Sequence, residues 1–324
     1  MQYRLLGNTG LKVSVIGVGC MTFGWRADAE AAYQIVSQSL DNGINVFDTS
    51  VSYGRGVSET LLGESFKRCG RRQEALIATK FGLAATADAK PNEVGNSKRT
   101  LIAHCELSLR RLHTEWIDLL QIHNFSSEVP LEETLRGLDQ LVRDGKIRYF
   151  GCCNFSGEQL YQGHSIVDRR NLFSIASHQG RFNLLDRRAE LDVMQVAVDH
   201  GMGNLAYSPL AEGLLTGKYQ QGRAFPAGSR FAVASPANQY EARLTTPVAD
   251  AVKALAGLAA KYSMELHHFA LAWVIAHPGV SCALVGPSTP HQMADINRVL
   301  DTRIDTETMG MVDAINPPGR CIFP

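Results

Sequence analysis

The chain contains 324 residues, 45% of them hydrophobic, and its 32 basic side chains balance 32 acidic ones. This size and composition support a large buried core and exclude a disordered chain. The balanced charge argues against a nucleic-acid-binding surface, whose affinity depends on clustered Lys and Arg. No linker divides the chain, so one domain over residues 1–324 is expected.

Cysteine usage and hydropathy indicate where the protein works. The seven cysteines include no C-x-x-C pair, so neither a disulfide framework nor a zinc site is indicated and a reducing compartment is expected. The N-terminal residues lack an apolar signal core, and no window approaches the ~18 uncharged apolar residues of a membrane helix. We therefore expect a cytoplasmic protein with no membrane partner.

The first 18 residues predict a β-hairpin followed by a barrel strand. Residues 3–6 and 11–14 have strand character and are joined by a glycine-containing loop at residues 7–10. A further strand is expected at residues 15–18. The hairpin should therefore close the bottom of the barrel.

Helix signals then recur along the chain. Asp28, Ser97 and Ser156 are expected to cap helices, and Gly43 should end the first of them. Pro130 stands where a helix begins. Helices are predicted over residues 29–42, 58–67, 97–112, 130–144, from 156, 186–200, 247–262, 266–276 and from 289, where the last helix is expected.

Short apolar runs alternate with these helices, and most of them end on a polar or ionisable side chain. The runs lie at residues 15–18, 44–47, 75–79, 116–122, 148–153, 174–178, 204–206 and 280–285. Eight strand–helix units predict an α/β fold, a (β/α)8 TIM barrel with an N-terminal β-hairpin. The irregular loop after strand 7, residues 208–245, should lie on the rim that holds the active site, since loops that long are usually functional or mobile.

Four residues at the expected strand ends could act together on a carbonyl group. Tyr53 has an ordinary pKa near 10, and a neighbouring Lys80 should lower it towards neutrality, while Asp48 holds the lysine charged. A neutral His123 can donate a hydrogen bond to a carbonyl oxygen. Each residue alone could be structural, but four such residues facing one cavity favour protonation of an alkoxide as hydride arrives on carbon.

These residues belong to motifs that resemble the aldo-keto reductase family, in a bacterial-type form related to the branch that includes potassium-channel beta subunits. In chain order the motifs are Met21–Gly24, Gly43–Thr49, Tyr53–Gly54, Ser58–Gly63, Thr79–Lys80, Asp118–His123, Gly145–Gly151, Tyr207–Leu210, Gly213–Tyr219 and Gly286–Asp295. The resemblance implies reversible, NADPH-dependent reduction of an aldehyde or ketone to an alcohol. Tyr53 is then the general acid/base, Asp48 and Lys80 tune it, and His123 orients the carbonyl.

The resemblance also implies a nicotinamide cofactor held without a G-x-G-x-x-G sequence, which is missing here between a strand and a helix. Cys153, where serine is usual, would contact the carboxamide with Asn154 and Gln179, and Tyr207 would stack on the nicotinamide ring. The other implied cofactor contacts are Met21, Asp48, Ser208, Pro209, Leu210, Lys218, Arg230, Gly286, Ser288, Gln292 and Asp295.

Among these contacts, Arg230 stands where the channel-subunit branch holds the 2′-phosphate, and it favours NADP(H). Ser288 replaces an arginine common in bacterial members, so NAD(H) is possible. The long loop would close over the pyrophosphate, and the start of the helix after residue 289 would favour anions.

Two other functions compete with the reductase. A nicotinamide-binding regulatory subunit with little turnover would share the motifs, but channel beta subunits have asparagine where His123 stands. A metal-dependent hydrolase would need clustered ligands, and only His123 and His178 are expected near the rim.

The partner is expected to be a small carbonyl or alcohol, with sugars, aromatic aldehydes, dicarbonyls and quinones all open. Aromatic residues Trp25, Phe81, Phe125, Phe225 and Phe231 either wall an apolar pocket or pack on neighbouring loops.

Overall fold

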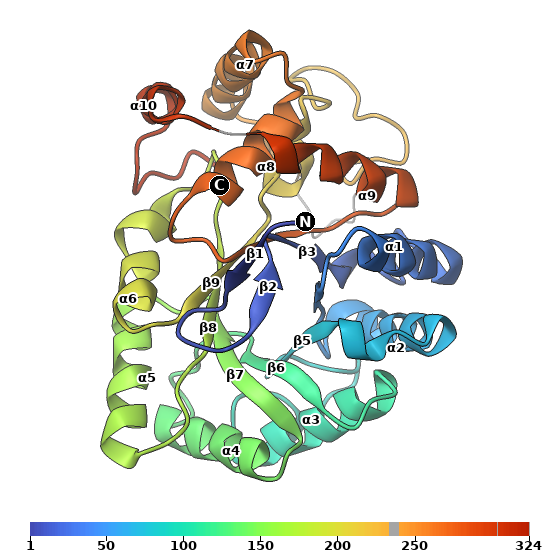
Figure 1. Ribbon diagram of the computed structural model, residues 1–324, viewed down its shortest axis with the longest axis vertical. Helices are drawn as coiled ribbons and strands as arrows, with labels where there is room; N and C mark the ends of the chain where they lie inside the picture. Colours follow the sequence, from blue (N-terminus) through green and yellow to red (C-terminus); the bar gives the residue numbers. More distant parts are fainter. Residues whose placement is uncertain (233–239, 303, 324) are drawn as a thin grey trace.

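Eight parallel strands close into a barrel in the computed structural model, which describes residues 1–232, 240–302 and 304–323 (Figure 1). Their order around the barrel is β10-β3-β4-β5-β6-β7-β8-β9, and every neighbouring pair is parallel. The strands are β3 (Ile16–Gly19), β4 (Val46–Asp48), β5 (Leu76–Phe81), β6 (Ile117–Ile122), β7 (Ile147–Cys153), β8 (Ser177–Arg181), β9 (Gly203–Tyr207) and β10 (Cys282–Val285). The predicted (β/α)8 barrel is confirmed.

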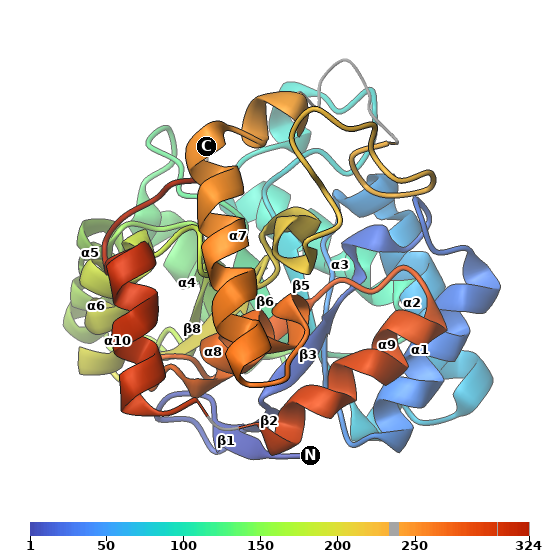
Figure 2. The same ribbon diagram turned by 90° about the horizontal axis from the view of Figure 1, so that it is seen from above.

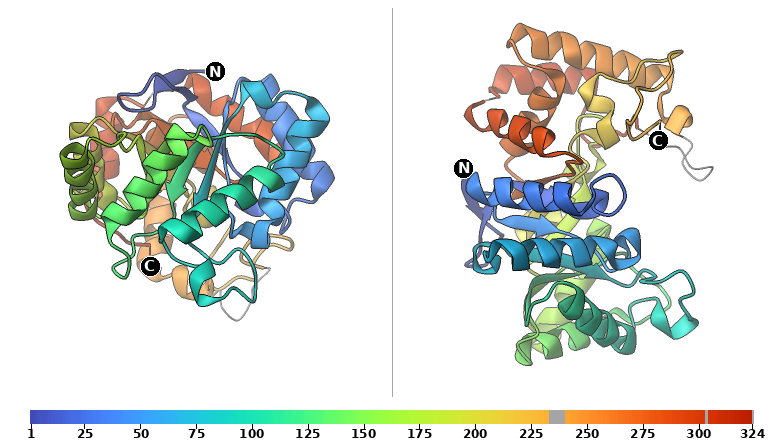
Figure 3. Two further views of the ribbon diagram at one scale, coloured as in Figure 1. Left: turned by 90° about the horizontal axis from the view of Figure 1, so that it is seen from below. Right: turned by 90° about the vertical axis from the view of Figure 1, so that its right-hand side faces the viewer.

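Helices surround the barrel on its outside (Figure 3). They are α1 (Ala29–Asp41), α2 (Val57–Cys69), α3 (Lys98–Arg111), α4 (Leu131–Arg143), α5 (Gly157–Arg170), α6 (Val193–Asp199), α7 (Thr246–Lys261), α8 (Leu266–Ala276), α9 (Pro290–Ile296) and α10 (Thr306–Ile315). The expected caps form: Asp28 accepts from the Ala31 amide, Ser97 from Thr100, and Ser156 from Gln159 in a reciprocal capping box.

The N-terminal hairpin closes the bottom of the barrel, as predicted. Its strands β1 (Tyr3–Leu5) and β2 (Lys12–Ser14) pair antiparallel. The side chains of Leu6 and Val13 are buried in a cluster that includes Leu119 and Leu205 from the barrel strands. The Arg4 guanidinium donates to the Val280 and Ile275 carbonyls at 2.5 and 2.8 Å. Apolar burial and these hydrogen bonds together fix the hairpin across this end.

Three helix predictions need correction. The helix at residues 290–296 is not the last, because α10 follows it. Asp186 does not begin a helix: its carboxylate accepts from Arg188, and α6 starts only at Val193, after a 3-10 turn. Ser58 lies inside α2, which starts at Val57, and its hydroxyl donates to the Cys20 carbonyl at 2.7 Å. The Asp186 carboxylate is engaged by the nearby Arg188 side chain, and the Ser58 hydroxyl by a tertiary contact with Cys20.

The long loop after β9 lies at the opposite end of the barrel from the hairpin (Figure 2). Its described part contains 3-10 turns at Ala211–Thr216 and Tyr240–Arg243. This end is where the strands terminate, so the loop occupies the predicted rim. Among the helices of the described ranges, none has the length and apolar character needed to cross a membrane.

Candidate active site

Four side chains meet where β4, β5 and β6 end. Asp48 is the last residue of β4, Lys80 lies in β5, His123 follows β6, and Tyr53 lies in a 3-10 turn after β4. The Lys80 ammonium is ion-paired with Asp48, donates to the Thr49 carbonyl at 2.9 Å, and lies 3.3 Å from the Tyr53 hydroxyl. The structure therefore brings the four predicted residues together.

Two glutamines complete the surroundings of the Asp48 carboxylate. The side-chain amides of Gln179 and Gln121 donate to its second oxygen at 2.7 and 3.2 Å. A buried ion pair is stable only when its remaining hydrogen-bonding capacity is satisfied, and these amides satisfy it. Gln121 was not predicted. Its signal was available, because a polar residue two positions before His123 in a strand faces the same side.

Arg111 holds the turn that carries Tyr53. Its guanidinium donates to the Val51 carbonyl at 3.3 Å and the Arg55 carbonyl at 3.4 Å, and it pairs with the buried Glu59 carboxylate at 3.2 Å. Gly56 permits this close approach, since a Cβ there would lie 2.1 Å from the Arg111 guanidinium carbon and its φ is +95°. The position of the phenol thus depends on contacts outside the four residues.

The electrostatics of Lys80 and Tyr53 follow from burial and from Asp48. Burial alone would lower the pKa of Lys80, but the Asp48 carboxylate raises it above its ordinary value, so the lysine is charged. Burial raises the pKa of Tyr53 to about 12, and the opposing effect of Lys80 is smaller. The expectation that Lys80 brings the phenol below its ordinary pKa is therefore wrong for this structure, because desolvation outweighs the ammonium.

His123 is a neutral imidazole beside the phenol. Burial, with a smaller contribution from the Lys80 charge, lowers its pKa to about 3. Its Nδ1 lies 3.1 Å from the Ser50 hydroxyl, and its ring meets the Tyr53 ring edge-on with 5.9 Å between centroids. A neutral ring carries one N–H, so His123 can donate one hydrogen bond to a ligand without carrying a charge.

The residues expected at the nicotinamide lie at the ends of β7, β8 and β9. Asn154 has a left-handed φ of +58°, and its side-chain amide donates to the His123 carbonyl at 3.1 Å. The Tyr207 hydroxyl donates to the Asn154 side-chain oxygen at 2.9 Å. Cys153 is fully buried, and burial raises the pKa of its thiol, so it is uncharged. With Gln179, these side chains adjoin the Asp48–Lys80 pair.

Left-handed backbone and a group of ion pairs lie in the loop after β9. Its backbone is left-handed at Ser208, Ala211 and Glu212, with φ of +54°, +46° and +59°. The Glu212 carboxylate pairs with Arg243 and lies 3.6 Å from Arg230. Neither Glu212 nor Arg243 was predicted, since their pairing depends on a backbone conformation that non-glycine residues rarely adopt.

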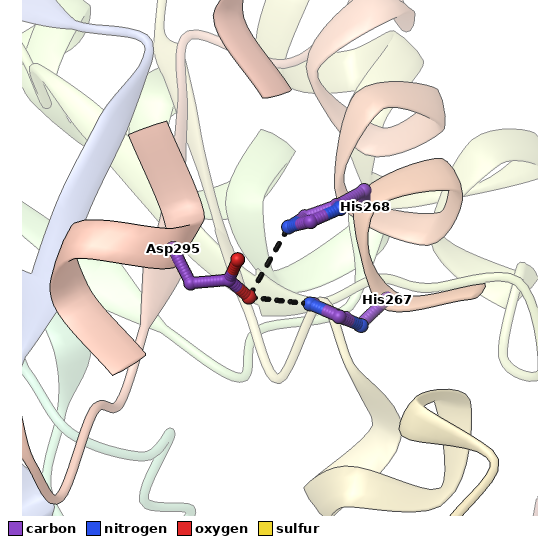
Figure 4. A group of neighbouring side chains, drawn as sticks. All are labelled: His267, His268 and Asp295. Atoms are coloured by element: carbon purple, nitrogen blue, oxygen red, sulfur yellow. Dashed lines mark hydrogen bonds and ion pairs between the residues drawn. The ribbon is translucent and has the colours of Figure 1, made fainter. Parts of the chain in front are cut away.

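The remaining expected cofactor residues lie around the same rim. Met21 lies in the turn after β3, and Gly286 directly follows β10. Ser288 is tied to Gln292 on α9, whose side-chain oxygen accepts from the Ser288 amide at 2.8 Å. Asp295, also on α9, pairs with histidines of α8 (Figure 4). Pro209, Leu210 and Lys218 belong to the loop after β9.

Several aromatic residues proposed as pocket walls pack against neighbouring loop residues instead. Phe231 is buried and stacks on Tyr219 with ring centroids 4.1 Å apart, and Phe225 meets Phe231 edge-on at 5.4 Å. Phe81 is fully buried, whereas Trp25 is 41% exposed and lies beneath the Arg230 guanidinium. Phe125 also meets Phe155 edge-on, with 5.4 Å between ring centroids, so the packing interpretation holds for Phe125, Phe225 and Phe231.

Comparisons with known proteins give the family. A sequence profile of the aldo/keto reductase family matches residues 15–317. The chain is 34% identical over 327 aligned positions to the Bacillus subtilis oxidoreductase YrpG, covering 98% of this chain and 97% of that protein. A probable voltage-gated potassium channel subunit beta of Arabidopsis thaliana is 32% identical, with 93% of this chain and 92% of that protein covered.

Aldo-keto reductase YhdN of Bacillus subtilis is 30% identical, with 97% of this chain and 93% of that protein covered. The profile spans the barrel and the residues at its rim, and the relatives include both reductases and channel-subunit-like proteins. The chain therefore belongs to the aldo/keto reductase family of oxidoreductases.

Proposed function

We propose that this protein reduces an aldehyde or ketone to an alcohol with a hydride from NADPH, and that it also catalyses the reverse oxidation. The observation that carries the proposal is the Tyr53 hydroxyl beside the charged Lys80, with Asp48 behind it and the neutral His123 next to it. We further propose that residues 1–324 act as one domain in the cytoplasm, on a small-molecule substrate.

The residues at the rim fit a nicotinamide dinucleotide. Asn154 and Gln179 offer amide groups suited to a carboxamide, and the Tyr207 ring offers a flat surface beside them. The backbone is left-handed at Ser208, Ala211, Glu212 and Gly213, and tight turns of this kind can bind phosphate oxygens. When bound, NADPH would supply the hydride.

The protein's own groups supply the proton and stabilise charge. As the carbonyl carbon gains hydride, its oxygen becomes basic and takes the proton from the Tyr53 hydroxyl. An alkoxide is about as basic as hydroxide, whose conjugate acid has a pKa of ~15.7, so a phenol of pKa about 12 still transfers its proton favourably. Lys80 then stabilises the phenolate, and His123 donates a hydrogen bond to the reacting oxygen. Solvent returns the proton to Tyr53.

The preference for NADPH over NADH rests on Arg230. A guanidinium fork binds a phosphate through two parallel hydrogen bonds. In the described structure Arg230 lies 3.6 Å from Glu212 and above the Trp25 ring. A 2′-phosphate arriving here would compete with the Glu212 carboxylate for the same guanidinium. NADH, which lacks that phosphate, would bind more weakly but still bind.

A second candidate is a nicotinamide-binding regulatory subunit with little turnover. The similarity to a protein named as a probable potassium channel subunit beta supports this alternative. The position and neutral state of His123 favour catalysis, because an imidazole N–H suits a substrate carbonyl.

Turnover and binding measured on the same protein distinguish the two candidates. Purified protein is supplied with NADPH or NADH and a panel of aromatic, aliphatic, sugar and dicarbonyl substrates, and binding of each cofactor is titrated in parallel. Tyr53→Phe removes the proton donor and should retain NADPH binding while turnover falls ~10²–10⁴-fold. Reduction at the wild-type rate by this variant would refute the mechanism. Tight NADPH binding without turnover on any substrate would support the regulatory candidate.

A further inference from the structure

Two histidines and one aspartate converge between helices α8 and α9 (Figure 4). His267 and His268 lie in the first turn of α8, and Asp295 lies near the end of α9. Nε2 of His267 is 2.7 Å from Oδ2 of Asp295, and Nε2 of His268 is 3.2 Å from the same oxygen. All three donor atoms lie within 4.8 Å of one another.

Hydrogen bonding does not account for the whole cluster. The His267–Asp295 contact has hydrogen-bond geometry, but the buried Nε2 of His268 has no hydrogen-bond partner in spite of its short distance to the carboxylate. A buried polar atom without a partner is uncommon and requires an explanation, such as an ion. The two imidazole rings lie with centroids 4.0 Å apart, so both nitrogens face the same small space beside the carboxylate oxygen.

We propose that His267, His268 and Asp295 form a binding site for a divalent transition-metal ion such as Zn²⁺. Two imidazole nitrogens and a carboxylate oxygen are donors suited to Zn²⁺, Co²⁺ or Ni²⁺, whereas Mg²⁺ and Ca²⁺ prefer oxygen alone. Zinc bonds to nitrogen and oxygen measure roughly 2.0–2.2 Å. The two histidine nitrogens lie 2.7 and 3.2 Å from the carboxylate oxygen. Small side-chain movements would therefore let one ion bond to all three atoms.

The surroundings leave the site accessible on one side. The side chains of His267 and Asp295 are 24% and 25% exposed, so water or a ligand can complete the metal coordination. The Arg298 guanidinium lies 3.6 Å from the other carboxylate oxygen, Oδ1. Oδ2 faces both imidazoles, and the metal would replace its hydrogen bond with His267. Bound metal would join α8 to α9.

Zinc binding to the full-length, chelator-treated protein tests the site. Isothermal titration should show a single Zn²⁺ bound per chain, no comparable Mg²⁺ binding, and a rise in the thermal unfolding midpoint with Zn²⁺. His267→Gln and Asp295→Asn should each weaken Zn²⁺ binding about tenfold or more, since each removes one of three protein ligands. Co²⁺ substituted for Zn²⁺ should give visible bands without the intense near-ultraviolet band of a thiolate ligand.

A second histidine pair provides the matched control. The rings of His164 and His200 lie with centroids 3.9 Å apart at an angle of 40°, and Nε2 of His164 lies 3.2 Å from the Asp168 carboxylate. His164→Gln should leave Zn²⁺ binding unchanged. Loss of binding in this variant but not in His267→Gln would overturn the proposal, as would wild-type protein that binds no zinc, that binds Mg²⁺ equally well, or that shows a thiolate band with Co²⁺. Metal-free unfolding midpoints establish that all three substituted proteins fold.

Discussion

The residues around Tyr53 and the loop after β9 form two parts of one site. Regular strands hold the first part in place, and an irregular loop holds the second. Asp48 and Lys80 lie within strands whose register is fixed by the parallel ladder, and their side chains are almost completely buried. Glu212, Arg230 and Arg243 lie on an irregular segment, and the two arginine side chains are 22% and 30% exposed. Rigid strands suit proton transfer, which needs fixed distances, whereas a loop can change its contacts as a cofactor enters.

The two regions should therefore respond differently to substitution. Breaking a buried ion pair by removing one partner destabilises a protein by about 3–5 kcal/mol, whereas an exposed pair contributes about 0–1 kcal/mol. We expect changes to the buried Asp48–Lys80 pair to affect turnover and folding together, and changes in the loop to affect cofactor affinity alone.

The largest effect is expected for Lys80→Met. This variant leaves the Asp48 carboxylate buried without its cation, so the free energy of unfolding should fall by about 3 kcal/mol and turnover by ~10²-fold or more. Urea unfolding and steady-state kinetics measure the two effects. Lys67→Met, at an exposed position on α2, is the control and should alter neither.

The double variant Asp48→Asn, Lys80→Met sharpens this prediction. It removes both charges, so it should recover much of the stability lost in Lys80→Met without recovering turnover. Equal stability of the single and double variants would show that the unpaired carboxylate is not the source of the loss.

Acid should destabilise the protein partly through His123. Its folded-state pKa of about 3 lies below the ordinary value of 6.5, so below pH 6.5 the unfolded state binds a proton that the folded state does not. Stability is therefore present above pH 6.5 and declines as the pH falls towards 3. Between pH 6.5 and 5 the decline from this residue is about 2 kcal/mol at most.

Urea titrations at both pH values measure that decline, and His123→Asn should reduce it. His178, whose pKa burial lowers to about 4, contributes in the same direction and remains in both proteins. Arg230→Ala serves as the loop control, and the slope of its stability against pH should match that of the wild type. An unchanged slope in His123→Asn would contradict the assigned pKa shift.

In the loop, Arg230→Ala should weaken NADPH binding about tenfold and NADH binding much less, because the lost charge-assisted hydrogen bonds involve the 2′-phosphate alone. Fluorescence titration with each cofactor measures the difference. Equal weakening of both cofactors would remove the proposed role of Arg230.

Glu212→Gln, in the same group of ion pairs, should have the opposite effect on the affinity for NADPH. It removes the carboxylate that competes with phosphate for Arg230, so NADPH should bind about threefold more tightly, the scale of a partly exposed ion pair. Turnover at saturating NADPH should stay the same. Weaker NADPH binding would instead mean that Glu212 orients the guanidinium for the cofactor.

The smallest effect is expected for Cys153→Ser. A hydroxyl is a stronger hydrogen-bond donor than a thiol, so cofactor affinity should rise slightly, by less than about threefold. The titration used for Arg230→Ala detects a change of this size. A large loss of turnover would indicate a role for the thiol beyond contact with the carboxamide.

The sequence predicted the strand-end residues well because each of them interrupts an apolar pattern. Asp48, Lys80 and His123 stand where buried runs stop, and a parallel barrel brings such positions together. Gln121 lies inside an apolar run, and its one signal in the sequence, its position two residues before His123, was overlooked. Helix α10 was missed because Gly310 near its middle lowers helix propensity.

The pKa of Tyr53 and the ion pair between Glu212 and Arg243 were harder to predict from the sequence. Whether Lys80 or burial has the larger effect on the pKa of Tyr53 depends on how completely folding removes water from around the phenol. The spacing of residues in the sequence does not show this. The pairing of Glu212 with Arg243 joins residues 31 positions apart through a left-handed backbone. The assigned roles of the site residues stay predictions until the experiments above are done.

Substitutions in the N-terminal hairpin should affect the amount of folded protein, whereas substitutions at the rim should affect its activity. Leu6 and Val13 seal the end of the barrel opposite the rim, so polar substitutions there should reduce the amount of folded protein in a cell while leaving the activity of each folded molecule intact. Substitutions of Tyr53 or His123 should do the opposite. In a deep mutational scan, residues of the hairpin should therefore separate from residues of the rim on a plot of abundance against activity.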